Sequence, residues 1–105
     1  MMLQKLPSRF EKYGFTYKLV VRDTYKAIYA QYVGNTLLAW EVIKIRVRPP
    51  KYNKFLKREE PAREVYPSSA QWGKWGWTIT NWKNDPEGSW ERALSRYYEI
   101  NKKND

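Results

Sequence analysis

The sequence predicts an α+β domain, in which a C-terminal helix packs on one face of a four-stranded antiparallel sheet. Two observations lead to this class. Between residues 15 and 47, apolar and polar side chains alternate with the period of two that half-buried strands show. Near the end of the chain, apolar residues recur three and four positions apart, as on one side of a helix. A length of 105 residues fits a single domain over 1–105, with a frayed tail at 102–105.

The first part of the chain is predicted as a helical turn followed by a three-stranded meander. Residues 8–13 resemble a capped turn, because Glu11 follows Ser8 by three positions. Turns are expected at Asp23-Thr24 and Gly34-Asn35, and the strands they separate are expected at 15–22, 25–33 and 37–47. Pro49-Pro50 ends the third strand, because proline has no N–H to donate to a sheet.

The second part contains a loop, one more strand and the helix. Residues 49–71 show no clean period and are predicted as a long basic loop, which in a small domain is usually functional or mobile. A fourth strand is expected at 75–82. Ser89 is predicted to cap the helix, with Asp85 as a turn or cap acceptor before it. The apolar side of the helix is Trp90, Ala93, Leu94 and Tyr97.

Treating both turns of the meander as two-residue loops assigns every strand residue to a face. Arg22 then lies opposite Tyr25, and Tyr29 lies opposite Trp40. One face becomes an apolar core under the helix: Phe15, Tyr17, Leu19, Val21, Ile28, Ala30, Tyr32, Leu37, Ala39, Ile43, Ile45 and Val47. The other face interleaves aromatic rings with cations. A one-residue bulge near Glu41 would exchange half of this assignment.

Positive charge is concentrated in one part of the chain. The net charge is +9, and residues 44–58 contain seven Lys and Arg but no Asp or Glu. Segregated charge of this kind is the electrostatic footprint of a protein that binds a phosphate backbone. It suits an acidic protein surface equally well. A membrane partner is disfavoured, because no amphipathic helix accompanies the basic run.

The second sheet face and the basic run together predict a nucleic-acid interface. Bases stack on aromatic rings while Lys and Arg neutralise phosphates, a combination typical of single-strand binding. The competing interpretation is an ordinary solvated sheet surface, with Lys and Arg stems over the rings. The predicted contact residues are Lys18, Arg22, Tyr25, Tyr29, Trp40, Lys44, Arg46, Arg48, Lys51, Lys54, Trp72 and Lys74.

The Trp-rich segment divides into one candidate exposed ring and a core set. Leu, Ile, Val and Phe total only 21 of 105 residues, so large aromatic rings must supply much of the buried apolar surface. Trp75, Trp77 and Trp90 are therefore expected in the core. Trp72, which precedes the strand and lies beside Gly73, is the candidate for an exposed ring.

The residue types of the chain argue against catalysis. Without cysteine or histidine there is no disulfide, Cys/His zinc site, Cys nucleophile or His base. The carboxylates are scattered, so no metal or other cofactor is expected and the protein is predicted not to be an enzyme. The alternation of side chains along the strand directs Glu41 toward the core. It is expected to pair there with Lys26 or a tyrosine hydroxyl, unless the strand bulges at this point. Solvated ion pairs are expected for Glu59, Glu60 and Glu64.

Two functions are predicted on these grounds. The first is a small basic protein that binds nucleic acid, preferring single-stranded DNA or RNA. The predicted order of elements resembles the ββββα single-stranded-DNA-binding modules of the transcriptional-coactivator and Whirly type. The alternative is an interaction or inhibitory module that docks an acidic partner protein, with Trp side chains as anchors.

Location and oligomeric state follow from two simpler observations. The sequence shows neither a leader nor an apolar run long enough to span a bilayer, so a cytoplasmic location is expected. One helix is narrower than a four-stranded sheet, which leaves part of the core face uncovered. Residues 1–13, the long loop or the second subunit of a homodimer are expected to cover it.

Overall fold

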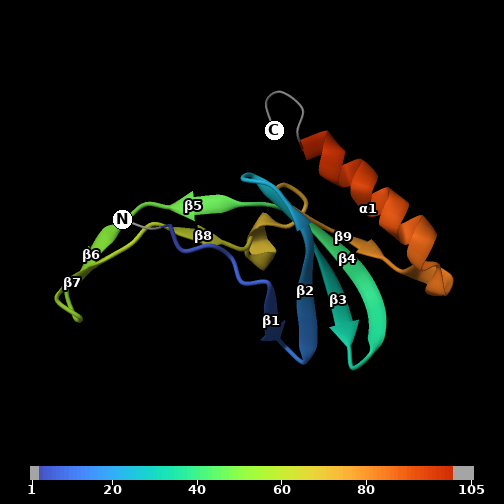
Figure 1. The fold of residues 1–105 in the computed structure, drawn as a ribbon, viewed down its shortest axis with the longest axis horizontal. Helices are drawn as coiled ribbons and strands as arrows, with labels where there is room; N and C mark the ends of the chain where they lie inside the picture. Colours follow the sequence, from blue (N-terminus) through green and yellow to red (C-terminus); the bar gives the residue numbers. More distant parts are fainter. Residues whose placement is uncertain (1–2, 101–105) are drawn as a thin grey trace.

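A computed structural model describes residues 3–100 and confirms the α+β class. The main sheet has five antiparallel strands in the order β1-β2-β3-β4-β9, and α1 (Pro86–Ile100) lies across one of its faces (Figure 1). Its strands are β1 (Arg9–Lys12), β2 (Phe15–Arg22), β3 (Lys26–Val33), β4 (Thr36–Lys44) and β9 (Gly76–Thr80). Short 3-10 turns at Ser69–Gln71 and Trp82–Asn84 flank β9. The predicted frayed tail at 102–105 lies outside the described residues.

Residues 9–12 form a strand, so the helical turn predicted at 8–13 is wrong. β1 pairs with the start of β2, from Arg9↔Lys18 to Lys12↔Phe15. Tyr13 and Gly14 join the two strands with φ of 56° and 82°, the left-handed conformation that a two-residue hairpin turn requires. Packing between strands outweighs the local capping pattern, because the rings of Phe10 and Tyr17 stack with centroids 4.7 Å apart.

Two β-bulges give the meander a register that differs from the predicted one. The turn at Gly34-Asn35 is as predicted, because Val33 pairs with Thr36. The register then shifts by one residue, so that Tyr29 pairs with Glu41 instead of Trp40. A second shift lies between Leu19 and Val21. Arg22 pairs with Ala27, not with Tyr25 as predicted. Each shift moves the side chains beyond it to the other face of the sheet.

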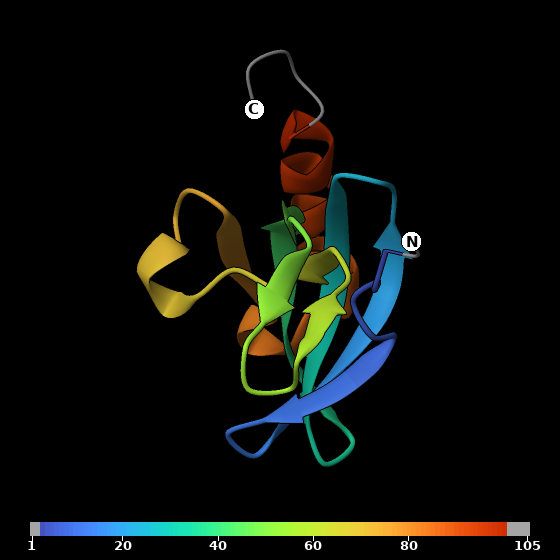
Figure 2. The ribbon, with the colours of Figure 1, turned by 90° about the vertical axis from the view of Figure 1, so that its left-hand side faces the viewer.

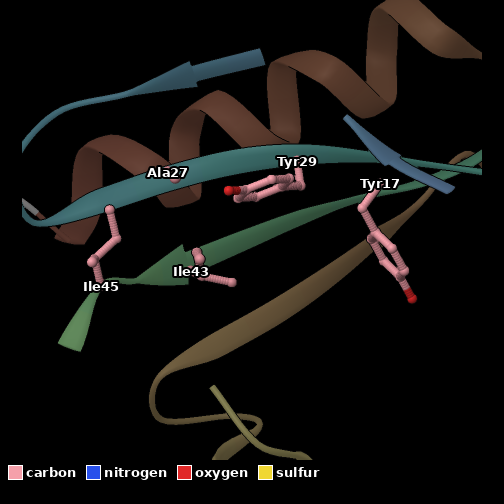
Figure 3. Close-up of a cluster of buried hydrophobic side chains, with 5 residues drawn as sticks. All are labelled: Tyr17, Ala27, Tyr29, Ile43 and Ile45. Atoms are coloured by element: carbon pink, nitrogen blue, oxygen red, sulfur yellow. The ribbon is translucent and has the colours of Figure 1, made fainter. Parts of the chain in front are cut away.

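The sheet is consequently buried on both faces. Under α1 the core consists of Ile28, Val42, Ala93, Tyr97 and Ile100. On the face away from the helix, a second cluster contains Tyr17, Ala27, Tyr29, Ile43 and Ile45 (Figure 3). The single core face that the sequence predicted is therefore wrong. Its members Val21 and Ile28 lie under the helix, whereas Phe15, Tyr17, Leu19, Ile43 and Ile45 lie on the opposite face.

The chain itself covers the face that lies away from the helix. Leu6 and Phe10 come from the N-terminal segment, and Tyr66 comes from the segment predicted as a loop. Trp72 completes the cover. Segments from 1–13 and 49–71 thus pack on the sheet, as two of the predicted alternatives had it, but on the face away from the helix, and the homodimer stays a prediction.

Polar contacts fix the N-terminal end of α1 to the sheet. The Gly88 N–H donates to Asp85 Oδ1 at 3.1 Å, so Asp85 caps the helix and the predicted cap, Ser89, does not. Ser89 is instead fully buried, and its Oγ accepts a hydrogen bond from Trp40 Nε1 at 2.9 Å. The first turn of the helix is thereby locked to the middle of β4.

A buried cation fixes the C-terminal end of α1. Lys26 is only 1% exposed, and its Nζ donates to the Tyr97 carbonyl oxygen at 3.0 Å. The same ammonium group lies 4.1 Å from the centroid of the Tyr97 ring. A cation at the carbonyl end of a helix offsets the partial negative charge there, which explains how a lysine is accommodated in the core.

Residues 46–65 form a two-stranded hairpin arm, where the sequence predicted a structureless loop. β5 (Arg46–Arg48) pairs with β8 (Arg63–Val65), and β6 (Lys51–Asn53) pairs with β7 (Arg58–Glu60). One register runs through both pairs and places Pro50 opposite Pro61, where the ladder is interrupted because proline cannot donate. The arm, residues 46–65, extends from the sheet away from α1 (Figure 1, Figure 2).

Gly76 is the position where the packing leaves no room for a side chain. A Cβ there would lie 2.5 Å from Cζ3 of the Trp72 ring. We therefore expect Gly76→Ala to lower the free energy of unfolding in urea by about 1–3 kcal/mol, the usual cost of overpacking. In a Trp72→Phe background, which removes the clashing atoms, the same substitution should cost less. An equal cost in both backgrounds would contradict this packing.

Candidate nucleic-acid interface

A buried ion pair holds the base of the arm to the sheet. Arg22, at the end of β2, donates from Nη1 and Nη2 to the two carboxylate oxygens of Glu64 at 2.7 and 2.8 Å. The Leu6 N–H donates to the same carboxylate at 2.9 Å. Hydrogen bonding to Arg22 lowers the pKa of Glu64, so the buried carboxylate stays ionised. Glu64 is therefore an anchor and not the solvated partner that was predicted, and Arg22, a predicted phosphate contact, is already engaged.

Backbone hydrogen bonds add a third segment to this base. The Gln4 N–H donates to the Ala62 carbonyl oxygen at 2.9 Å, and the Glu64 N–H donates to the Gln4 carbonyl oxygen at 2.8 Å. The N-terminal segment thus runs beside β8 in parallel pairing with Arg63. Two-stranded ribbons are marginally stable by themselves. These contacts and the ion pair together fix the direction in which the arm leaves the sheet.

A second buried carboxylate, that of Glu41, binds the segment of the chain that follows the arm. The Tyr66 hydroxyl donates to Glu41 Oε1 at 2.5 Å, and the Thr78 hydroxyl donates to Oε2 at 3.4 Å. Burial raises the pKa of Glu41 and also that of Tyr66. Of the two partners predicted for Glu41, the tyrosine hydroxyl is the one observed and Lys26 is not, and both oxygens of Glu41 have donors.

Cations line both strands of the arm. Residues 46–65 contain seven Lys and Arg against three Glu. A cleft of about 580 Å³ opens where the prolines interrupt the pairing, and it is lined by four cations, two from each strand: Arg48, Lys51, Arg58 and Arg63. Glu59 and Glu60 also line the cleft, and Glu60 accepts a hydrogen bond from Asn53 Nδ2 at 2.7 Å. The cleft therefore offers an anion more positive than negative charge.

The arm ends in an exposed apolar tip. Phe55 is 98% exposed and Leu56 is 54% exposed, and the two lie between Lys54 and Lys57 in the turn. Asn53 Oδ1 accepts hydrogen bonds from the Phe55 and Leu56 N–H groups at 2.9 and 3.0 Å. A side-chain acceptor of this kind replaces a backbone turn and fixes its conformation. The tip is thus an ordered turn that presents a phenyl ring to solvent.

The structure brings six predicted contact residues together on or beside the arm, including Lys44, which ends β4 just before the arm begins. Four are exposed on the arm itself: Arg46, Arg48, Lys51 and Lys54. Tyr25 lies at the root of the arm, because its carbonyl oxygen accepts a hydrogen bond from the Ile45 N–H at 2.7 Å. Lys18 and Lys74 are exposed as well, but they lie outside the arm.

Tyr29 and Trp40, the centre of the predicted stacking face, are packed inside the fold. Tyr29 is fully buried, its hydroxyl donates to the Pro7 carbonyl oxygen at 2.6 Å, and burial raises its pKa to about 12. Trp40 is half-buried against Trp90 of α1, with ring centroids 4.8 Å apart. The register shift puts the two rings on opposite faces of the sheet, so the predicted stacking surface does not form.

Trp72 is not the exposed ring that was predicted. It stacks on Tyr66 with ring centroids 6.3 Å apart, and its Nε1 donates to Thr78 Oγ1 at 3.0 Å. Trp82 is instead the exposed tryptophan of this segment, with 68% of its surface accessible. The ring beside Gly73 turns inward because Gly76 leaves room for it.

Cations and indole rings alternate beside β9 at the root of the arm. Lys44 Nζ lies 5.6 and 5.8 Å from the ring centroids of Trp75 and Trp77. Arg46 Cζ lies 5.2 Å from Trp75, and Arg96 Cζ lies 4.6 Å from Trp77. Cation–π attraction of this kind offsets the repulsion between neighbouring cations. Trp77 packs under α1, as the core prediction requires, whereas Trp75 is half-buried between Lys44 and Arg46.

Sequence reasoning missed the arm and its tip, although a signal for both is present. The turn at 54–57 is flanked symmetrically by Pro50 and Pro61, and Asn53 directly precedes it. Strand segments of three residues between prolines are too short to show a period, which is why they appeared structureless. Symmetry about an Asn-initiated turn would have identified the hairpin.

Comparisons with protein-family models, with curated proteins and with solved structures give no match. The resemblance in element order to single-stranded-DNA-binding modules therefore stays a prediction. Within residues 3–100, no cluster of three or more acidic side chains is placed to hold a metal ion. No helix in that range has both the length and the apolar character needed to cross a bilayer.

Replacing Glu64 by Gln tests the ion pair at the base of the arm. Breaking a buried pair costs about 3–5 kcal/mol, and we expect the lower end because the Arg22 side chain remains 20% exposed. Since the pKa of Glu64 is lowered in the folded protein, the pair stabilises it above the ordinary Glu pKa, and this stabilisation is lost as the pH falls through the folded pKa. Urea unfolding of E64Q should show lower stability at neutral pH and a flatter decline into acid.

The matched control is Glu59→Gln, which removes the same charge from an exposed position on the same arm. It should change the free energy of unfolding by less than about 0.5 kcal/mol. Wild-type stability together with wild-type acid sensitivity in E64Q would contradict the anchoring role of Glu64.

Proposed function

We propose that this protein is a small, non-enzymatic nucleic-acid-binding protein that prefers single-stranded DNA or RNA and binds it with the arm. The observation that carries the proposal is the arm itself. It bears cations on both strands and projects from a sheet whose two faces are already covered. In this proposal, base stacking and phosphate neutralisation take place on the arm, whereas the sequence had suggested the sheet face for them.

The spread of charge along the arm suits a long polyanion. From Arg46 to Lys54 the outgoing strand covers roughly 25 Å, at about 3.3 Å per residue. This length exceeds the screening distance of about 8 Å at physiological ionic strength. A small anion at one end would therefore interact with few of the cations, whereas a phosphate backbone lying along the arm would interact with all of them. Each neutralised phosphate releases counterions, so binding should depend steeply on salt.

Exposed aromatic rings follow the same path as the cations. Tyr25 lies at the root of the arm, Tyr52 on β6 and Phe55 at the tip, with exposures of 71%, 59% and 98%. Unpaired bases stack on such rings, whereas duplex bases are already stacked on one another. Tyr25 is the one member of the predicted stacking set that remains accessible, and Tyr52 and Phe55 take the place of Tyr29 and Trp40.

An acidic partner protein is the alternative function. Trp82, exposed beside Lys83, favours it, because tryptophan is enriched among the residues that dominate protein interfaces. Trp82 lies outside the arm, so the two functions use different surfaces and respond to different substitutions.

Charge reversal on the arm tests the proposed function. Anisotropy of a labelled oligothymidylate should show that R48E/K54E weakens binding by roughly tenfold or more at low salt. The slope of log affinity against log salt should become shallower by about 1.4, because each lost single-strand phosphate contact removes about 0.7. Both side chains are exposed, and circular dichroism should show an unchanged fold.

R9E/K83E carries the same change in net charge on exposed residues outside the arm, and it should bind almost as the wild type does. Equal weakening in both double variants would contradict a role for the arm. Wild-type protein that fails to bind any oligonucleotide at low salt would refute the proposed function and favour the acidic partner.

A further inference from the structure

We infer that Phe55 and Leu56 form a wedge that inserts between neighbouring bases, and that the preferred ligand is therefore single-stranded nucleic acid or a duplex with unpaired bases. The inference rests on the proposed function. It goes further by naming the side chains that insert and the ligands that they distinguish.

The exposure of the tip is the first step. Phe55 leaves 98% of its surface in water, and Leu56 beside it leaves 54%. A solvent-exposed phenyl ring forgoes the stabilisation that burial would give it. The other two phenylalanines of the chain, Phe10 and Phe15, pack against the core cluster on the face away from the helix. A ring left outside at the end of a projecting arm is thus available to a ligand.

The order of the tip is the second step. Asn53 Oδ1 accepts hydrogen bonds from the N–H groups of both tip residues. The Nδ2 of the same side chain donates to Glu60 Oε1 on the opposite strand at 2.7 Å. The turn is therefore preorganised by its own hydrogen bonds. Preorganisation lowers the entropy lost when the tip enters a ligand.

The flanking charges are the third step. Lys54 and Lys57 lie on either side of the apolar pair within the same turn. Proteins that open a base step insert Phe, Leu or similar side chains between the bases. When the wedge enters a step, cations on both sides of it are placed to meet the phosphates that flank the opened bases.

The choice between paired and unpaired nucleic acid follows from the cost of insertion. Opening a step in a fully paired duplex breaks base stacking, whereas a mismatched, bulged or single-stranded base is already weakly stacked. We therefore expect affinity to be highest for single strands, intermediate for a duplex with a bulge or mismatch, and lowest for a fully paired duplex.

The charge distribution favours nucleic acid over an anionic lipid surface at the tip. A bilayer that receives Phe55 would meet the cations nearest the tip. Arg46 and Arg63, at the root of the arm, would lie on the order of 25 Å away, beyond the screening distance of about 8 Å. A polymer lying along the arm engages the root and the tip together.

The test compares wild-type protein with Phe55→Ala and Phe55→Trp on three ligands: a single strand, the same strand in a bulged duplex, and a fully paired duplex. Phe55→Ala should weaken single-strand binding roughly 5- to 150-fold, the effect of losing one stacked base. It should affect the paired duplex much less and leave the salt slope unchanged. Phe55→Trp should preserve the preference, and 2-aminopurine in the single strand should change fluorescence with wild-type protein but not with Phe55→Ala.

The matched control is Tyr13→Ala. Tyr13 is 87% exposed on the β1–β2 turn, with Lys12 Nζ 5.4 Å from its ring centroid, so it resembles Phe55 in setting but lies outside the arm. It should leave all three affinities unchanged.

Unchanged affinities in Phe55→Ala, or an equal loss on all three ligands, would overturn the wedge while leaving the phosphate contacts of the arm intact. Wild-type protein that binds none of the three would overturn the proposed function and the wedge together. That result combined with Phe55-dependent binding to anionic phospholipid vesicles would assign the tip to a lipid surface.

Discussion

The bidentate ion pair between Arg22 and Glu64 joins the two parts of this molecule, the sheet and the arm. Its members are 42 residues apart in the chain, and the carboxylate also accepts the Leu6 N–H, so three segments meet at one buried charge. A two-stranded hairpin whose pairing is interrupted by prolines on both strands is marginally stable, so it would not keep one orientation without contacts at its base. The hydrogen bond from the Tyr66 hydroxyl to the buried Glu41 carboxylate likewise attaches the chain to the sheet just after the arm ends. Both contacts hold the returning strand, and the Ile45 N–H donates to the Tyr25 carbonyl oxygen where the outgoing strand begins. The arm is thus held at both strands of its base, which lets it present its charges and its tip as one surface.

A sheet that is buried on both faces determines which residues remain for binding. The chain is poor in aliphatic side chains, and tyrosine, tryptophan and phenylalanine therefore fill both cores. Tyr29 packs in the core on one face of the sheet, and Trp40 packs on the other face. Among the exposed rings, Tyr52 and Phe55 lie on the arm, where they accompany cations, whereas Tyr13, Tyr25 and Trp82 lie at turns and Tyr98 lies on α1. The shortage of aliphatic residues thus accounts for the position of the proposed interface as well as for the packing of the fold.

Sequence patterns predicted the class, the strands of the meander, the fourth strand and the helix, because each of these has a clear period. They also included a tyrosine hydroxyl among the expected partners of Glu41, and they located the concentration of positive charge that the arm carries. The faces were not predictable, since the bulges in β2 and β4 have no marker in Val20 or Leu38 and each reverses the parity beyond it. β1 was misassigned because its strand character comes from Phe10 packing on distant rings. The predicted contact residues on the arm are exposed, whereas Tyr29 and Trp40 are packed on opposite faces of the sheet.

We propose that nucleic acid contacts the arm and not the sheet or the helix. Backbone amide chemical-shift mapping with an oligothymidylate at low salt tests it most directly, because it reports every segment at once. The largest shifts are expected within residues 46–65 and at Tyr25, with small shifts in β1 and α1. Shifts centred on α1 or on the Trp82 turn, with the arm unaffected, would contradict it.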